Sequence, residues 1–138
     1  MALPTKLTLE IVTPDRALLR EEVDEVVLPG SQGEFGVLPG HTPLLSTLKI
    51  GELWYRQGQE RHYLAIAFGF VEVLPDRVTV LAQVGERAQE IDVQRAEQRL
   101  AQAQPQLTQV DFDIERARIA LMKSLLRLQV ASRARTRV

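Results

Sequence analysis

The sequence contains no cysteine, and this absence removes several classes of chemistry. Without thiols there is no disulfide framework, no cysteine nucleophile and no cysteine-based zinc site. Long apolar runs are also absent: the longest, residues 64–71, has eight residues, whereas a membrane-spanning helix needs roughly 20. Residues 1–6 carry no apolar stretch of the kind that forms a signal peptide. We therefore expect a soluble chain that faces the cytoplasm.

Histidine is scarce as well, with only His41 and His62 in the chain. A catalytic triad needs a base that a third group orients, and no such partner is evident in the sequence around either histidine. Two isolated histidines also do not make a metal site. We therefore expect no catalytic residues, no bound metal and no enzymatic activity in this chain itself.

The net charge of −1 hides an asymmetry between two parts of the chain. Residues 1–85 carry 7 basic and 11 acidic side chains, whereas residues 86–138 carry 10 basic and 7 acidic ones. All 8 glycines and all but one of the 7 prolines precede residue 86. Such a shift predicts two units of different structural class. We place a β domain over residues 1–86 and an α-helical domain over residues 87–138.

The first part has the pattern of short β-strands. Leu7, Leu9 and Ile11 alternate with more polar residues, which indicates a strand with one buried face. Further β-rich runs cover residues 23–28, 35–38, 44–50, 53–56, 62–68, 70–74 and 77–82. Pro75 suits a tight turn between the last two runs. Short strands with frequent turn residues, uninterrupted by helical segments, predict an antiparallel β-sandwich or barrel.

The second part has the pattern of two helices. Residues 92–104 contain no Gly or Pro, and Asp92 is a suitable N-cap because its carboxylate can accept backbone N–H groups. Pro105 is expected to end this helix, and Asp111 to cap a second helix that runs to about Ser132. Two apolar faces are expected, one of Val93, Ala96, Leu100 and Ala103, the other of Ile114, Ala117, Leu121, Leu125 and Leu128. A short connector between two such helices predicts an antiparallel hairpin.

Residues 30–41 form a glycine-rich segment that needs an explanation. It is not a phosphate-binding loop, because it lacks the Gly-Lys-Ser/Thr ending and no helix follows it. Glu34 would also repel a phosphate. From the residues alone, two interpretations remain open: tight turns between short strands, or an exposed loop that contacts a partner.

The last helix and the tail are basic. A solvated helix face is the simplest interpretation, and binding to an acidic protein or to nucleic acid are alternatives. Only Phe112 of the seven aromatic residues lies in this part, so the aromatic side chains that stack on bases are missing. The cations are Arg116, Arg118, Lys123, Arg127, Arg133, Arg135 and Arg137.

Three motifs, in order along nearly the whole chain, resemble one family, the epsilon subunit of rotary F-type ATP synthases of the bacterial type. Its signature loop is similar to residues 33–45, GEFGVLPGHTPLL. Its second signature is similar to residues 69–73, GFVEV, followed by residues 78–82, VTVLA. The segment that opens its C-terminal helices is similar to residues 91–96, IDVQRA.

The resemblance implies an α+β protein: an N-terminal antiparallel β-sandwich followed by a two-helix antiparallel hairpin. It implies a non-catalytic subunit of the central rotor stalk that couples transmembrane proton flow to ATP synthesis. The sandwich would contact the gamma subunit and the c-ring, and the hairpin would rise toward the catalytic alpha/beta hexamer and inhibit ATP hydrolysis. The subunit would lie at the cytoplasmic face of the bacterial plasma membrane as a peripheral part of the complex. The alternative is a stand-alone protein- or nucleic-acid-binding module that uses the basic helix.

The resemblance also assigns residues. Glu34 and His41 match the loop positions at the gamma and c-ring contact, and the cations expected to contact an acidic segment of the beta subunit are Arg116, Arg118 and Lys123. No cofactor is required, but some family members bind ATP at the hairpin. The matching positions here are Glu86, Asp92, Arg95, Lys123 and Arg127. Because Gln102 and Gln106 stand where those members carry arginine, we expect weak ATP binding or none.

Overall fold

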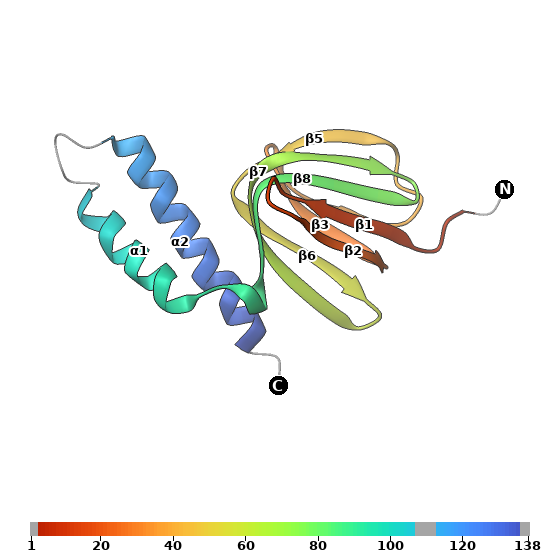
Figure 1. The fold of residues 1–138 in the computed structure, drawn as a ribbon. Helices are drawn as coiled ribbons and strands as arrows, with labels where there is room; N and C mark the ends of the chain where they lie inside the picture. Colours follow the sequence, from red (N-terminus) through yellow and green to blue (C-terminus); the bar gives the residue numbers. More distant parts are fainter. Residues whose placement is uncertain (1–2, 107–112, 136–138) are drawn as a thin grey trace. The chain divides into compact units, whose positions relative to one another are not determined.

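The computed structural model describes residues 3–106 and 113–135. The chain divides into two compact units, Met1–Glu86 and Arg87–Val138, and each is described by itself. The strands of the first unit are β1 (Leu7–Val12), β2 (Ala17–Val23), β3 (Glu25–Gly30), β4 (Gly33–Val37), β5 (Leu44–Leu48), β6 (Gly51–Gln57), β7 (Glu60–Leu74) and β8 (Arg77–Arg87). Figure 1 labels them along the chain.

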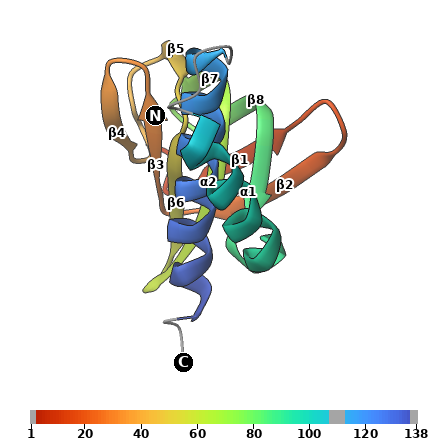
Figure 2. The same ribbon diagram turned by 90° about the vertical axis from the view of Figure 1, so that its left-hand side faces the viewer.

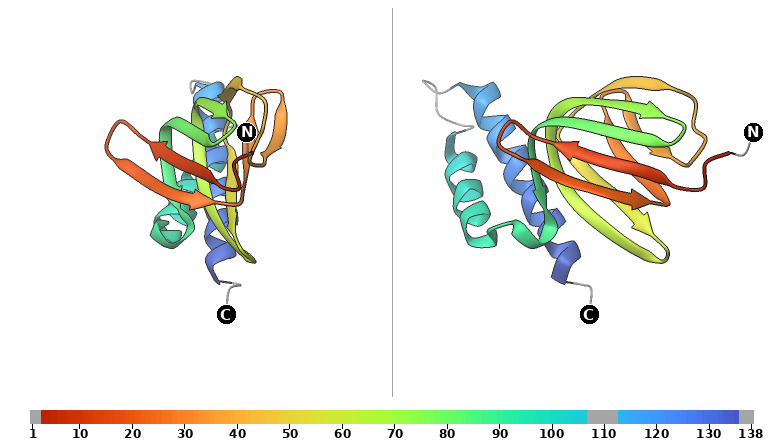
Figure 3. Two further views of the ribbon diagram at one scale, coloured as in Figure 1. Left: turned by 90° about the vertical axis from the view of Figure 1, so that its right-hand side faces the viewer. Right: turned by 45° about the vertical axis from the view of Figure 1, so that its right-hand side comes forward.

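The strands join in the order β2-β1-β8-β7-β5-β3-β4, and β6 pairs with both β3 and β7. The expected antiparallel pairing holds for most neighbours, but β1 and β8 run parallel. The β1–β2 and β3–β4 hairpins lie at opposite edges of the unit, as Figures 2 and 3 show. The β-sandwich architecture predicted from the sequence is therefore confirmed, with one parallel pair inside it.

A single hydrophobic core fills the interior of this unit. Leu7, Leu9 and Ile11 are fully buried, as their alternation in the sequence predicts. Each of the other strands contributes inward side chains to the same cluster, mainly leucine, isoleucine and valine. Burial of this many branched side chains gives the unit a well-packed interior.

A bend in β7 allows this one strand to pair with two neighbouring strands. The sequence suggests two separate strands here, but β7 is continuous, pairing with β6 before the bend and with β5 after it. At the bend Phe68 has φ 61° and Gly69 has φ 141°. A Cβ atom on Gly69 would lie 2.0 Å from the carbonyl oxygen of Leu81, so only glycine fits there.

The second unit contains a short 3₁₀ turn, η1 (Ala88–Glu90), and the helices α1 (Val93–Gln106) and α2 (Ile114–Arg135). The Oδ1 atom of Asp92 accepts the N–H of Arg95 at 3.1 Å, which confirms Asp92 as the N-cap of α1. Helix α1 includes Pro105, so the prediction that Pro105 ends the helix was wrong by two residues. A proline this close to the end of a helix removes only one backbone hydrogen bond.

The start of α2 also differs from the prediction. The expected cap, Asp111, lies outside the described residues. The Oδ1 atom of Asp113 instead accepts the N–H of Arg116 at 3.2 Å, and α2 begins directly after it. Two aspartates two residues apart offer equivalent caps in the sequence, and only the structure distinguishes them.

Most buried positions of the two helices hold small side chains, and the two helices pack side by side. In α1 the buried residues are Ala96 and Ala103. In α2 they include Ala117, Ser124 and Ala131, spaced seven residues apart, together with Val130. The expected burial of the larger residues was partly wrong: Ile114 is 54% exposed and Leu125 is 50% exposed. The hairpin therefore buries little apolar surface compared with the sandwich.

Candidate functional site

The signature loop places Glu34 and His41 at opposite ends of β4. Glu34 is exposed just after the β3–β4 turn, where it pairs with Pro29. His41 lies beyond the other end of the strand, half-buried, with its Nδ1 atom 2.6 Å from the carbonyl oxygen of Thr42. The structure therefore presents the two predicted contact residues as separate points on the sandwich.

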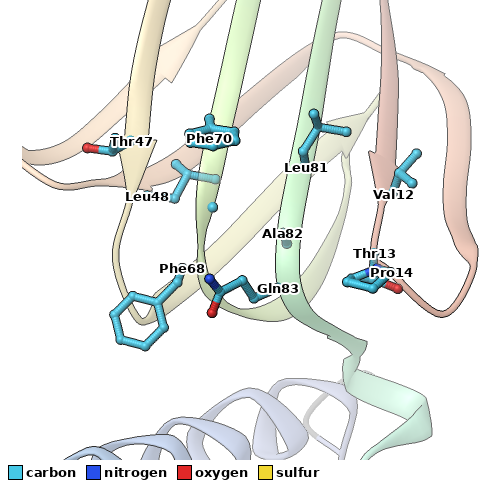
Figure 4. Close-up of a pocket in the computed structure, with 11 residues that line it drawn as sticks. Val12, Thr13, Pro14, Thr47, Leu48, Phe68, Phe70, Leu81, Ala82 and Gln83 are labelled. Atoms are coloured by element: carbon cyan, nitrogen blue, oxygen red, sulfur yellow. The ribbon is translucent and has the colours of Figure 1, made fainter.

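A groove of about 580 Å³ crosses four strands of the sandwich. Figure 4 shows its lining side chains on β5, β7, β8 and the end of β1. Strand pairing aligns a row of outward-facing side chains along the groove. Thr47 pairs with Phe70, Val12 pairs with Leu81, and β7 neighbours β8. Phe70 is 54% exposed and Leu81 is 48% exposed. An apolar row on an outward sheet face is typical of an interaction site.

The surroundings of this row combine apolar and acidic character. Two residues further along the strands, Leu45 pairs with Glu72 and Glu10 pairs with Thr79. Leu45 is 74% exposed, and Glu72 is exposed. At the other end of β5, the Oγ atom of Ser31 lies 2.6 Å from Oγ1 of Thr47, which connects the turn before Glu34 to the groove. A partner suited to this face would present an apolar side chain with basic residues nearby.

The cations of α2 do not form one patch. At 100° per residue, Arg116, Lys123 and Arg127 fall on one side of the helix. Arg118 lies about 160° away from Arg116, on the side that carries the exposed Ile114, Met122 and Leu125. Its Nη1 atom contacts Oε1 of Glu115 at 3.0 Å, an exposed pair that contributes little to stability.

The residues suggested for ATP binding have varied environments. Glu86 is near the end of β8, and Arg95 is exposed in the first turn of α1. Asp92 already caps α1 with one carboxylate oxygen. Lys123 and Arg127 are half-buried on the cationic side of α2. The Asp92 carboxylate thus has a structural role that needs no nucleotide.

Residues 3–106 and 113–135 contain no helix long and apolar enough to cross a membrane. Over the same described ranges, no three His, Cys, Asp or Glu side chains gather as metal ligands would. The groove was missed in the sequence because Val12 and Phe70 lie far apart in the chain, and only strand register brings them onto one face.

Comparison with known families matches both units. Residues 6–88 match the model of the ATP synthase delta/epsilon chain β-sandwich domain, and residues 89–132 match the model of its long α-helix domain. The "ATP synthase epsilon chain 2" of Syntrophotalea carbinolica is 49% identical over 131 residues, covering 93% of this chain and 95% of the relative. The "ATP synthase epsilon chain" of Syntrophobacter fumaroxidans is 50% identical over 135 residues, covering 93% and 97%.

Two solved structures share the fold. A chain of the Euglena gracilis mitochondrial ATP synthase complex with OSCP, F1 and c-ring superposes with a TM-score of 0.72 at 21% identity, covering 98% of this chain and 82% of that one. A chain of the Tetrahymena thermophila mitochondrial ATP synthase central stalk and c-ring gives a TM-score of 0.59 at 15% identity, covering 98% and 100%. The sandwich followed by two helices is thus an arrangement found in known proteins.

Proposed function

The chain belongs to the delta/epsilon chain family of the ATP synthases, and from that premise we propose that it is a non-catalytic subunit of the central stalk. In this role it turns with the rotor and couples transmembrane proton flow to ATP synthesis. It is peripheral to the membrane through the complex, on the cytoplasmic side. The match of both domain models and the near-complete coverage of epsilon-chain relatives carry this proposal. They also leave the nucleic-acid-binding alternative without support.

The sandwich is the part that holds the subunit on the rotor. We assign the groove row of Phe70 and Leu81 to the gamma subunit, and the exposed loop positions Glu34 and His41 to the contact with gamma and the c-ring. Apolar side chains half exposed in a hollow supply contact area, and the nearby Glu10 and Glu72 favour a basic border on gamma.

The helical hairpin is the regulatory part. Its buried residues are mostly small side chains, so the helices can leave one packing arrangement when another offers comparable stabilisation. When raised toward the alpha/beta hexamer, α2 would meet an acidic segment of the beta subunit through Arg116, Arg118 and Lys123. Because Arg118 lies apart from the other two, this contact involves two sides of the helix.

ATP is a candidate regulatory ligand of the hairpin with weak affinity. We assign Arg95, Lys123 and Arg127 to its phosphates, while Gln102 and Gln106 supply no charge. Calorimetric titration of the full chain with ATP tests this point. Submillimolar binding that is lost in Arg127→Gln would show that a nucleotide site exists despite the two glutamines.

Truncation after Ala88 tests the regulatory part of the proposal. The truncated chain should keep a folded sandwich that binds gamma, and the enzyme containing it should hydrolyse ATP faster than the enzyme with the full chain. Replacing Arg116, Arg118 and Lys123 with Glu should relieve much of the same inhibition of ATP hydrolysis. Equal hydrolysis rates for the truncated and full-length subunits across ATP concentrations would mean that the hairpin does not inhibit.

Substitution in the groove tests the rotor contact. Leu81→Glu should weaken binding to isolated gamma, because the carboxylate would lose hydration against an apolar partner. Leu3→Glu is the matched control, since Leu3 is also exposed but does not line the groove. Failure of the unmodified chain to bind gamma at all would refute the rotor assignment.

A further inference from the structure

Asp24 connects three segments at one corner of the sandwich. The residue lies between β2 and β3, and its N–H donates to the carbonyl of Arg56 at 2.8 Å. Its Oδ2 atom accepts the N–H of Gly58, in the β6–β7 turn, at 2.7 Å. Its Oδ1 atom accepts from the ammonium of Lys6, and Nη1 of Arg56 lies 3.9 Å from Oδ2. One carboxylate thus joins the chain before β1 to the tip of the β6–β7 hairpin.

Two further carboxylates hold the same hairpin tip. Oε2 of Glu21, on β2, accepts from the hydroxyl of Tyr55 at 3.3 Å and from Nε2 of Gln57 at 3.0 Å. Oε1 of Glu25, on β3, accepts from Nε of Arg56 at 3.1 Å. Hydrogen bonds to charged groups contribute more than neutral ones. We call Glu21, Asp24 and Glu25 the carboxylate clamp.

We propose that the carboxylate clamp is an acid-released device that fixes the tip of the β6–β7 hairpin against the β2–β3 corner. In each contact, a carboxylate oxygen accepts a hydrogen bond from the facing donor. When a carboxylate is protonated, it loses its charge and part of its acceptor capacity. The tip then detaches while the strands below it, anchored by Leu53 and Leu64 in the core, remain paired.

The direction of the effect follows from Asp24. The pKa of Asp24 lies below its ordinary value of 3.8. The hydrogen bond from Lys6 lowers it most, followed by the hydrogen bond from the N–H of Gly58 and by the charges of Lys6 and Arg56. Because the pKa of Asp24 is lower in the folded chain, its contacts stabilise the fold fully at any pH above the ordinary pKa. This stabilisation is lost as the pH falls through the lowered pKa of the folded chain. The Asp24 contacts are therefore made at neutral pH and lost in acid.

Other ionisable groups lie beside the clamp, and the effect of their protonation must be distinguished from that of the clamp carboxylates. His62 stacks on Tyr55 with ring centroids 4.8 Å apart, and its Nε2 lies 3.7 Å from Oε2 of Glu60. The ionisable groups that contact the clamp, or stack on Tyr55, are Lys6, Tyr55, Arg56 and His62. Glu22 follows Glu21 in the sequence, and Glu60 and Arg61 pair with Gln57 and Arg56 across the β6–β7 hairpin. Histidine titrates well above the range of carboxylates, so a His62→Gln variant distinguishes the two causes.

Trp54 provides a local reporter, since it is the only tryptophan in the chain. It lies on β6 next to Tyr55, and Cζ of Arg61, across the hairpin, is 4.3 Å from its ring centroid. Detachment of the tip should change its fluorescence. The exchange rate of the Gly58 amide hydrogen, followed by NMR, reports the same event at the bond to Asp24.

The experiment uses the full chain and an acid titration from neutral pH. We expect the fluorescence of Trp54 to change before the β-sheet circular dichroism is lost, with the same midpoint in His62→Gln. At neutral pH, Asp24→Asn should speed Gly58 amide exchange by about tenfold or more. Asp76→Asn, in the exposed β7–β8 turn, is the matched control and should leave that exchange unchanged.

Two results would overturn the proposal. One is a single acid transition in which fluorescence, Gly58 exchange and circular dichroism change together. The other is an Asp24→Asn variant with unchanged Gly58 exchange. Should Asp24→Asn fail to fold, Glu21→Gln is the second variant, and the exchange of the Gln57 side-chain amide is its readout. Unchanged exchange in that variant would equally contradict the clamp.

Discussion

The two units of this chain are packed in contrasting ways. The sandwich buries leucine, isoleucine and valine side chains from all its strands in one cluster. The helices of the hairpin bury mainly alanine and serine, with one valine, and leave Ile114, Met122 and Leu125 exposed. A core of branched side chains has one favoured arrangement, whereas an alanine-lined helix contact gains little from burial. Rearrangement of a whole element of this subunit is therefore expected in the helical hairpin.

The exposed apolar residues have different settings in the two units. In the sandwich, Phe70 and Leu81 lie on a sheet whose other face is fully packed, so their positions are fixed by the strands. In the hairpin, the exposed leucine and methionine lie on a helix that is held by small contacts. The sandwich thus offers a preformed surface, and α2 offers one that can move with its helix.

Matched leucine truncations should give the largest difference between the units. Leu64→Ala, at a site 1% exposed, should lower the free energy of unfolding by about 2–5 kcal/mol. Leu125→Ala, at a site 50% exposed, should change it by less than about 0.5 kcal/mol. Urea unfolding of the full chain measures both, with Trp54 fluorescence reporting the sandwich and circular dichroism at 222 nm reporting the helices. Similar losses in the two variants would contradict the contrast in packing.

Enlarging a small residue in the helix contact should affect the hairpin alone. Ala103 is buried, so Ala103→Leu should destabilise the hairpin by about 1–3 kcal/mol through overpacking. Ala101→Leu, on the exposed side of the same helix, is the control and should be nearly neutral. Melting curves at 222 nm report the helices, and Trp54 fluorescence reports the sandwich. A parallel loss of both signals would mean that the units unfold together.

Removal of the helix caps should have a smaller effect. Asp92→Ala and Asp113→Ala each delete a side-chain acceptor of a backbone N–H and should cost about 1 kcal/mol of helix stability. The Asn variants retain the acceptor and should keep most of the stability. Thermal melting followed by helical circular dichroism compares each Ala variant with the Asn variant at the same position. If Asp113→Ala has no effect, the first turn of α2 does not depend on this cap.

The sequence predicted those features that depend on neighbouring residues. Alternation of Leu7, Leu9 and Ile11 revealed a buried strand face, and the position of Asp92 before a helix-forming segment revealed a cap. Strand β2 was not predicted, because its charged residues interrupt a simple alternation. The bend at Gly69 was also missed, since it depends on the close approach of Leu81 from the next strand.

The candidate site shows the same limit. Glu34 and His41 came from a sequence motif, and their assignment to partners stays a proposal. The groove could not be read from the sequence, because Val12 and Phe70 share a face only through the pairing of β1, β8 and β7. The assignment of the α2 cations to the beta subunit also stays a proposal, and spacing around the helix separates Arg118 from Arg116 and Lys123.

The smallest change in stability is expected in the signature loop. Glu34 is exposed, and the ring of His41 contacts the carbonyl oxygen of the adjacent Thr42. Glu34→Gln and His41→Ala should therefore each change the free energy of unfolding by less than about 0.5 kcal/mol. In the assembled enzyme, the same substitutions should weaken the coupling of ATP hydrolysis to proton pumping, because they remove polar groups from the proposed rotor contact. Gln32→Ala, in the exposed turn before β4, is the control for effects of the hairpin tip itself. Proton pumping by membrane vesicles, normalised to the hydrolysis rate, is the measurement. Unfolding of the sandwich with coupling intact would mean that these two residues have only a structural role, and the groove would then remain the main candidate contact of the sandwich.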